Sequence, residues 1–209
     1  LRVSRQKGPA PKAGIVHLGL GAFFRAFGAV YIEEAMAASG GGDWGIVGVS
    51  LRSPAIRDQL AGQDFVYTAR ELGPEGSRLH QVEIVRDVLV APESPEAVLA
   101  AMADPAIRIV TLTVTEKGYC HDPASGRLNF SNPDIEHDLT AALPRSAPGY
   151  LVRSLQRRKA AGVPPFTVLT CDNLPDNGRL VKGIVLELAR AIDPDLAAWL
   201  EAEGRFPAT

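Results

Sequence analysis

Apolar residues occur along this chain in short runs that alternate with segments of helical spacing. The run at 15–19 leads through a glycine-rich turn into a segment at 25–38 whose apolar residues recur with helical periodicity. A second run at 44–51, rich in β-branched residues, is followed by another helical segment at 53–62. The chain therefore opens with two units of strand followed by helix.

Two segments at 65–73 and 79–91 alternate between apolar and polar residues with a period near two. A Pro-Glu-Gly-Ser turn separates them, so the pattern predicts an antiparallel β-hairpin inserted into the alternation of strands and helices. In the alternative arrangement, one of the two segments extends the edge of the sheet.

The alternation then resumes around a long β-branched run at 108–116. A strand buried on both faces has this composition, and we expect it near the centre of the sheet. The remaining elements are helical segments at 94–104, 134–143 and 149–162, a strand-into-loop segment at 165–178 and a last helix at 179–192. The whole pattern predicts an α/β fold, in which a mainly parallel, doubly wound sheet with right-handed crossovers carries helices on both faces.

Length and composition are those of one domain with a sizeable core. The 209 residues are 46% hydrophobic, so we expect a single domain at 14–209. Residues 1–13 are basic and contain proline, and we expect a loose lead-in. The apolar run that follows is too short for a signal peptide or a membrane span. A net charge of -2 argues against nucleic acid as a partner.

Cysteine and histidine are few and scattered. Cys120 and Cys171 lack the spacing of a disulfide framework or a metal site, so we expect no metal and a reducing, cytoplasmic location. His17 lies inside the first predicted strand, where a histidine is more often packed than catalytic. The spacing of the other histidines gives no Ser-His-Asp or Cys-His arrangement.

Gly19 and Gly21 stand where the first strand gives way to the first helix. In a dinucleotide-binding fold the first glycine permits the tight turn, and the second lets the backbone approach a pyrophosphate at the positive end of the helix dipole. The third glycine of the GxGxxG pattern is absent, and Ala22 or Ala26 would take its place. Alone, the turn is equally consistent with a methyltransferase or with a purely structural strand-to-helix unit.

The tip of the second strand carries Arg52 instead of an acidic residue. An acid there binds the ribose hydroxyls of NAD, whereas an arginine can accept the additional phosphate of NADP. The nearest following acid, Asp58, falls inside the next predicted helix. Arg52 is therefore either a solvated loop cation or a contact to the NADP phosphate.

Three separated motifs carry a resemblance to a known family. They are GLGAFFRA at 19–26, TLTVTEKGYC at 111–120 and TCDNLPDNG at 170–178. Together they resemble the polyol-specific long-chain dehydrogenases, the mannitol dehydrogenase family that includes mannitol 2-dehydrogenase and fructuronate reductase. The resemblance extends from about residue 14 to the C-terminal end. It implies a Rossmann-like domain that binds NAD, with NADP as the alternative, for hydride transfer to or from a secondary alcohol of a linear polyol or sugar acid.

In that family the first motif binds the phosphates of the cofactor. The resemblance therefore assigns to the pyrophosphate turn Gly19, Gly21, Phe23, Phe24 and Arg25. Arg25 would also supply positive charge to a phosphate. In the alternative, Arg25 is a helix cation that pairs with Glu33 or with water.

Glu116 ends the β-branched run of the second motif, at the edge where open α/β sheets place their ligands. The resemblance implies that this residue lines the active site and helps to exchange protons with solvent. A glutamate buried beside a cofactor can titrate near neutrality, as such a role needs. In the alternative, Glu116 and Lys117 form a plain surface pair.

Asn173 follows the strand of the third motif. Its family counterpart donates a hydrogen bond to the substrate oxygen, and a neutral amide stabilises developing negative charge there without competing for the proton. In the alternative, an Asn or Asp of this segment caps the next helix, where Asp176 and Asn177 are also available. The motif keeps Asp172 near the cofactor, and we expect its role to be mainly structural.

The sequence departs from the family pattern at two places near the expected cofactor. Family members usually continue the first motif with His-Gln, but this chain has Phe27 and Gly28, and a glycine inside a helix costs about 1 kcal/mol relative to alanine. Where NAD-dependent mannitol dehydrogenases have an acidic pair after the second strand, this chain has Pro54 and Ala55. NAD and NADP therefore both stay open, and the fructuronate reductase branch is the closer one.

The helical C-terminal domain of the family, with its catalytic lysine, asparagine and histidine, is absent from this sequence. Without that general base, we expect the chain alone to be inactive or nearly so. Two other classes of protein stay open. One is a non-catalytic nucleotide-binding module or truncation product. The other is a methyltransferase that uses adenosylmethionine, against which the second and third motifs argue.

Overall fold

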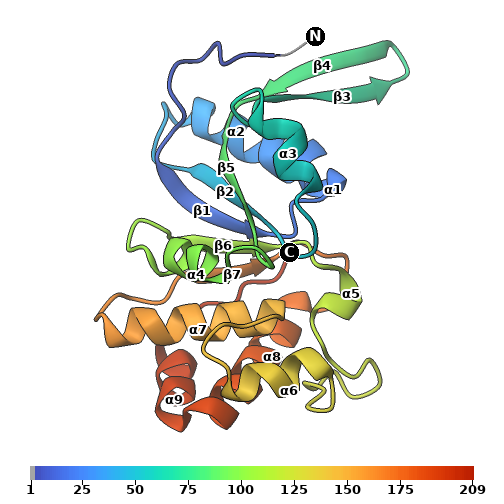
Figure 1. Ribbon diagram of the computed structural model, residues 1–209. Helices are drawn as coiled ribbons and strands as arrows, with labels where there is room; N and C mark the ends of the chain where they lie inside the picture. The colour runs from blue at the N-terminus through green and yellow to red at the C-terminus, as the bar shows by residue number, and fades with distance from the viewer. Residues whose placement is uncertain (1–2) are drawn as a thin grey trace.

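A five-stranded parallel sheet forms the centre of the computed structural model, which describes residues 3–209 (Figure 1). The strands are β1 Ala13–Leu18, β2 Gly45–Ser50, β5 Val85–Val90, β6 Ile109–Leu112 and β7 Thr167–Thr170. They stand in the order β5-β2-β1-β6-β7, and each neighbouring pair is parallel. The chain winds outward from β1 in one direction and then in the other, which confirms the predicted doubly wound α/β fold.

Helices cover both faces of this sheet, as predicted. On one face lie α1 Ala22–Ala26, α2 Gly28–Ala38 and α3 Ala55–Ala61; on the other lie α4 Pro95–Ala103 and α7 Ala147–Ala160 (Figure 1). The first helix was predicted as one continuous segment, but it divides at Phe27, whose φ and ψ are −118° and −75°. The remaining helices are α5 Thr115–Gly118, α6 Pro133–Thr140, α8 Asn177–Ile192 and α9 Pro194–Glu203.

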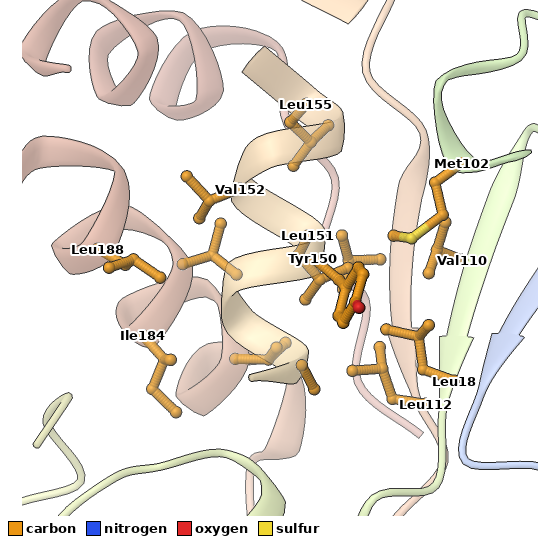
Figure 2. Packing of buried hydrophobic residues seen from close by; sticks show 14 of the residues in the cluster. Leu18, Met102, Val110, Leu112, Tyr150, Leu151, Val152, Leu155, Ile184 and Leu188 are labelled. Carbon is orange, nitrogen blue, oxygen red and sulfur yellow. The ribbon is translucent and has the colours of Figure 1, made fainter. Parts of the chain in front are cut away.

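Side chains of the central strands alternate between two hydrophobic clusters because successive residues of a strand point to opposite faces. Ile15 packs with the cluster under α2 and α3, whereas Val16 packs with the cluster under α4 and α7. Figure 2 shows the second cluster, in which α7 lies between the sheet and α8, with Ile184 and Leu188 of α8 on its outer side. The sheet is therefore buried on both faces.

The predicted hairpin is confirmed in part. Strands β3 Tyr67–Gly73 and β4 Gly76–Val82 pair antiparallel as a separate two-stranded sheet. The segment predicted as one strand at 79–91 is divided, however, because the chain turns at Glu83 and Ile84 and β5 joins the main sheet beside β2. Each half of that segment alternates on its own, so the pattern alone did not reveal the change of sheet.

The predicted strand at 108–116 is correct in its place but wrong in its length. β6 lies between β1 and β7, inside the sheet, but it ends at Leu112. The chain then bends into the one-turn helix α5, whose first residue, Thr115, has a φ of 65°. A β-branched residue with positive φ is strained, and such strain persists only where the surrounding structure enforces it.

The last predicted helix corresponds to α8, but a further helix, α9, was missed. Asp193 caps α9, since its side chain accepts hydrogen bonds from the backbone N–H groups of Asp195 and Leu196, and Pro194 stands at the first helical position. Both signals are present in the sequence, as Asp-Pro-Asp at 193–195.

After α9 the chain runs parallel to the outer edge of β7. The N–H of Val168 donates to the carbonyl oxygen of Arg205 at 2.9 Å, and a bridge joins Thr167 to Arg205. Farther along, the buried Asn177 holds Thr209 by two hydrogen bonds, of 2.8 and 3.2 Å. This segment satisfies backbone groups that an open strand edge leaves exposed.

Residues 3–12 form neither helix nor strand, and three of them hydrogen-bond to the segment that joins β4 to β5. The guanidinium of Arg5 donates to the carbonyl oxygens of Glu83, Asp64 and Val85. The Glu83 carboxylate accepts in turn from the N–H groups of Gln6 and Lys7. The lead-in thus fastens the corner between β4 and β5.

Candidate functional site

The glycine turn follows β1 at the point where the sheet order reverses, between β1 and β6. Gly19 has a φ of 92°, and a Cβ there would lie 2.2 Å from the carbonyl oxygen of Thr113. Its N–H donates to Val49 O at 2.9 Å. Gly19 therefore forms the tight turn expected of it, and no other residue type fits.

Gly21 has open space in front of it. It is exposed, and the only atom within 4 Å of a Cβ built there is the carbonyl oxygen of Gly19, at 3.7 Å. It caps α1, in which the N–H of Arg25 is bonded to Gly21 O at 3.1 Å. The N–H groups of Ala22 and Phe23 precede that bond at the positive end of the helix.

Phe23 and Phe24 have opposite environments. Phe23 is 59% exposed, whereas Phe24 is 2% exposed and packs in the core under α2 and α3. The ring of Phe24 stacks on the imidazole of His17, with 3.3 Å between the ring centroids. The side chain of Phe24 is therefore turned away from solvent, and only its backbone faces the turn.

Arg25 folds back over the glycine turn. Its guanidinium donates to the carbonyl oxygen of Leu20 at 2.8 Å. The alternative partner considered for it, Glu33, is occupied elsewhere, since Glu33 accepts from the N–H of Glu83 at 2.8 Å and pairs with Lys7 at 3.1 Å. The positive charge of Arg25 thus stays beside the turn.

His17 is fully buried in β1 and bonded through both ring nitrogens. Nδ1 lies 2.7 Å from Oγ1 of Thr111, and Nε2 lies 2.9 Å from Oγ1 of Thr113. The Thr113 hydroxyl donates onward to Gly19 O at 2.8 Å. Burial lowers the pKa of His17 to about 3, so the ring is neutral, which confirms the packed role predicted for it.

The tip of β2 borders a cavity of about 720 Å³. Leu51 lines this cavity together with Ala91 and Pro92 after β5 and with Tyr150 of α7. Arg52 follows Leu51 and is exposed, and within residues 3–209 its guanidinium takes part in no hydrogen bond. The acid nearest in sequence, Asp58, lies in α3 as predicted and pairs with Arg57 at 2.8 Å.

Asp172 connects the loops that follow β6 and β7. Its carboxylate accepts from the N–H of Val114 at 2.9 Å, from the N–H of Thr115 at 3.3 Å and from the hydroxyl of Tyr119 at 2.7 Å. Burial raises the pKa of the Tyr119 phenol, which therefore keeps the proton that it donates. These contacts match the structural role expected of Asp172.

Glu116 and Asn173 are both exposed on these two loops. Glu116 lines a cavity of about 470 Å³ whose wall includes His121, Leu174 and Arg179. Asn173 adjoins the cavity through Leu174. Neither side chain makes a hydrogen bond or ion pair within residues 3–209, so Glu116 is not paired with Lys117, as the surface alternative would have it.

Asn173 also does not cap the helix that follows it. α8 begins at Asn177, and its N-cap residue is Asp176, which has a φ of 48° and makes no capping hydrogen bond with its side chain. Glu116 is exposed, four residues after the end of β6.

The sequence did not predict the roles of three side chains: Thr111 of β6, Thr113 in the loop after β6, and the phenol of Tyr119. The signal for Thr111 and Thr113 was their spacing of two within the β-branched run, which in an extended chain places both side chains on the same side. Their partner follows only from the register of β1 against β6, in which His17 stands opposite Thr111.

No group of three or more His, Cys, Asp or Glu side chains in residues 3–209 is arranged to hold a metal ion. No helix in the same range has the length and apolar character needed to cross a membrane.

Fold and turn together define the class of protein. A doubly wound parallel sheet, with a glycine turn at the switch point and a helix N-terminus directly after it, is a Rossmann-type domain. The chain belongs to the mannitol dehydrogenase family, since the family model described as the mannitol dehydrogenase Rossmann domain matches residues 13–209. The resemblance carried by the three motifs is thereby confirmed.

Relatives and solved structures agree with this assignment. The chain is 47% identical over 198 residues to the uncharacterized oxidoreductase YeiQ of Escherichia coli, and 42% identical over 207 residues to mannitol 2-dehydrogenase of Aspergillus fumigatus. These alignments cover 93% and 97% of this chain but 40% and 41% of the relatives. The chain thus spans about two fifths of the length of these relatives.

Two solved structures match the fold with a TM-score of 0.88 each. One is a substrate-free D-sorbitol dehydrogenase, 41% identical, with 94% of this chain and 42% of that one covered. The other is Pseudomonas fluorescens mannitol 2-dehydrogenase in a ternary complex with NAD and D-mannitol, 40% identical, with 94% and 41% covered.

Proposed function

We propose that this chain is the NAD-binding part of an oxidoreductase that moves a hydride between the nicotinamide and a secondary alcohol carbon of a linear polyol or sugar acid. The proposal rests on one observation. The loops that follow β1, β6 and β7 meet at one edge of the sheet, at the point where the strand order reverses. The matched relatives and solved structures include a mannitol 2-dehydrogenase and a D-sorbitol dehydrogenase.

The residues at that edge fit a dinucleotide. Gly21 leaves room for a pyrophosphate in front of the first turn of α1, and Arg25 supplies positive charge beside it. The cavity behind Leu51 lies at the tips of β2 and β5, the direction in which the adenosine of an extended dinucleotide runs from such a turn. Within the proposal, Gly19, Gly21, Phe23, Phe24 and Arg25 hold the cofactor, the two phenylalanines through their backbone.

Glu116 and Asn173 form the substrate side of the proposal. When bound, NAD supplies the nicotinamide carbon that accepts or gives the hydride. The Asn173 amide, which has no partner within residues 3–209, is free to donate to the reacting oxygen of the substrate. Glu116, exposed on the rim of the cavity, exchanges protons with solvent. Asp172 keeps both loops in place.

The activity of the whole protein extends beyond these residues. The chain covers about two fifths of its relatives, and we propose that the general base lies in the part that it does not span. The isolated chain is then expected to bind NAD without turning over substrate.

We also propose a cytoplasmic location for the protein, because Cys120 and Cys171 are both free thiols.

A thermal-shift titration with NAD, NADP and adenosylmethionine tests the proposal. At a ligand concentration of 100 times Kd, selective binding stabilises the folded chain by about 2.7 kcal/mol, which raises the Tm by roughly 5–10 °C. We expect this shift with NAD. A shift with adenosylmethionine alone would establish the methyltransferase alternative, and no shift with any of the three would refute the proposed cofactor site.

Turnover is measured separately with D-mannitol, D-sorbitol and D-mannonate as substrates. Oxidation of any of them by the purified chain would show that the base lies within these residues. Binding of NAD without turnover agrees with the proposal.

A further inference from the structure

We propose that His17 is a positioning residue for the dinucleotide turn, because its buried ring fixes both the carbonyl of Gly19 and the helix that follows the turn. This inference rests on the proposed function, since it concerns how the NAD site is held in shape.

The hydrogen bonds around His17 have one consistent direction. The Thr113 hydroxyl donates to Gly19 O, so its oxygen is left to accept from the Nε2–H of His17. Nε2 then carries the proton, and Nδ1 accepts from the hydroxyl of Thr111. One neutral tautomer therefore satisfies every polar atom of the cluster.

Gly19 O is the point on which this cluster converges. It accepts from Thr113 Oγ1 at 2.8 Å, lies 3.2 Å from Nε2 of His17 and accepts from the N–H of Gly21 at 2.6 Å. Because a peptide group is planar, fixing this oxygen also fixes the direction of the N–H of Leu20, which points to Val49 O at 3.3 Å. The peptide between the two halves of the turn cannot rotate without breaking these bonds.

The opposite contact of His17 is to α1. Its ring stacks flat on Phe24, with an interplanar angle of 8°. Phe24 stands in the first turn of α1, beside the N–H groups that would face a pyrophosphate. The His17 side chain therefore fixes both the orientation of the Gly19 carbonyl and the position of the N-terminus of α1. An aliphatic residue at position 17 would still pack against Phe24, but it would lose the polar contacts that orient the carbonyl.

Two substitutions remove different parts of this arrangement. His17→Leu removes both ring nitrogens, and Thr113→Val removes only the hydroxyl that reaches Gly19 O. Thr113→Ser keeps that hydroxyl and serves as the conservative variant. Val98→Ala, in α4 within the other hydrophobic cluster, lowers stability without touching the turn and is the matched control.

The experiment compares the Kd for NAD by calorimetry and the amide hydrogen exchange of residues 19–25 in all variants. We expect His17→Leu and Thr113→Val to raise the Kd roughly tenfold, the effect of losing one well-placed donor. Exchange should accelerate at residues 19–25. Thr113→Ser and Val98→Ala should keep the wild-type Kd. If His17→Leu does not fold, Thr113→Val and Thr113→Ser decide the question.

The inference is overturned if Val98→Ala weakens NAD binding as much as the turn variants, or if those variants bind NAD like the wild type. In both cases the proposed function stands, because the wild-type chain still binds. A wild-type chain that does not bind NAD would instead refute the proposed function and this inference with it.

Discussion

Gly28 lies against the ring of Phe24, and a Cβ at position 28 would come within 2.5 Å of two ring carbons. Phe24 is held in place on its other side by the stacked imidazole of His17. The glycine that seemed unfavourable for the first helix is therefore required in this chain by the packing of the side chain one turn before it.

Replacing Gly28 with alanine should destabilise the protein although alanine is the better helix former. We expect the crowding of Phe24, about 1–3 kcal/mol, to outweigh the gain in helix propensity of about 1 kcal/mol. The free energy of unfolding in urea measures the result. Gly183→Ala in α8 is the matched control: nothing lies within 4 Å of its Cβ, so it should gain about 1 kcal/mol. A gain in both variants would contradict the packing argument.

Removing the carboxylate of Asp172 should cost more than removing an exposed aspartate with similar bonds. Asp172→Ala leaves two N–H groups and the Tyr119 hydroxyl without their acceptor, at about 2–3 kcal/mol. Asp122→Ala, in an exposed turn where the carboxylate also accepts two hydrogen bonds, should cost less than about 1 kcal/mol. If both variants lost the same free energy of unfolding in urea, Asp172 would not be the residue that connects the two loops.

The stability of the fold should depend on pH through His17. Its pKa is about 3 in the folded chain and 6.5 in the unfolded one, so between these values the unfolded chain binds the additional proton. The contribution of His17 to the free energy of unfolding is complete above pH 6.5. It is lost as the pH falls toward 3, by up to about 1.4 kcal/mol per pH unit. Urea unfolding of wild type and His17→Gln at pH 7, 6, 5 and 4 isolates the effect: their difference should shrink as the pH falls. A constant difference would mean that His17 does not titrate in this range.

Arg52 decides between NAD and NADP if it contacts the cofactor. It is exposed beside Leu51, at the rim of the cavity proposed for adenosine. Arg52→Ala should then weaken NADP binding by roughly tenfold, since a charged hydrogen bond to the additional phosphate is lost, and leave NAD binding unchanged. Calorimetric titration with both nucleotides measures this. Equal affinities before and after the substitution would mark Arg52 as a solvated loop cation.

The sequence by itself determined most of the alternation of strands and helices and the place of the glycine turn. Hydrophobic periodicity and turn residues are local properties, and they identify β1, β2, β7 and the helices that follow them. The sequence pattern also marks position 19 as a glycine. The reason for that glycine, the close approach of Thr113 O, comes from the loop after the distant strand β6. The three motifs sufficed to identify the family.

Only the tertiary structure decided which side chains meet. The alternation at 79–91 continues through the point where the chain leaves the hairpin for the main sheet, so no local signal marks the start of β5. Likewise, the partners of His17 and of Asp172 stand 94 and 58 residues away in the chain. Those pairings depend on strand register and on the loops at one edge of the sheet, and interactions between residues so far apart leave no periodicity along the sequence.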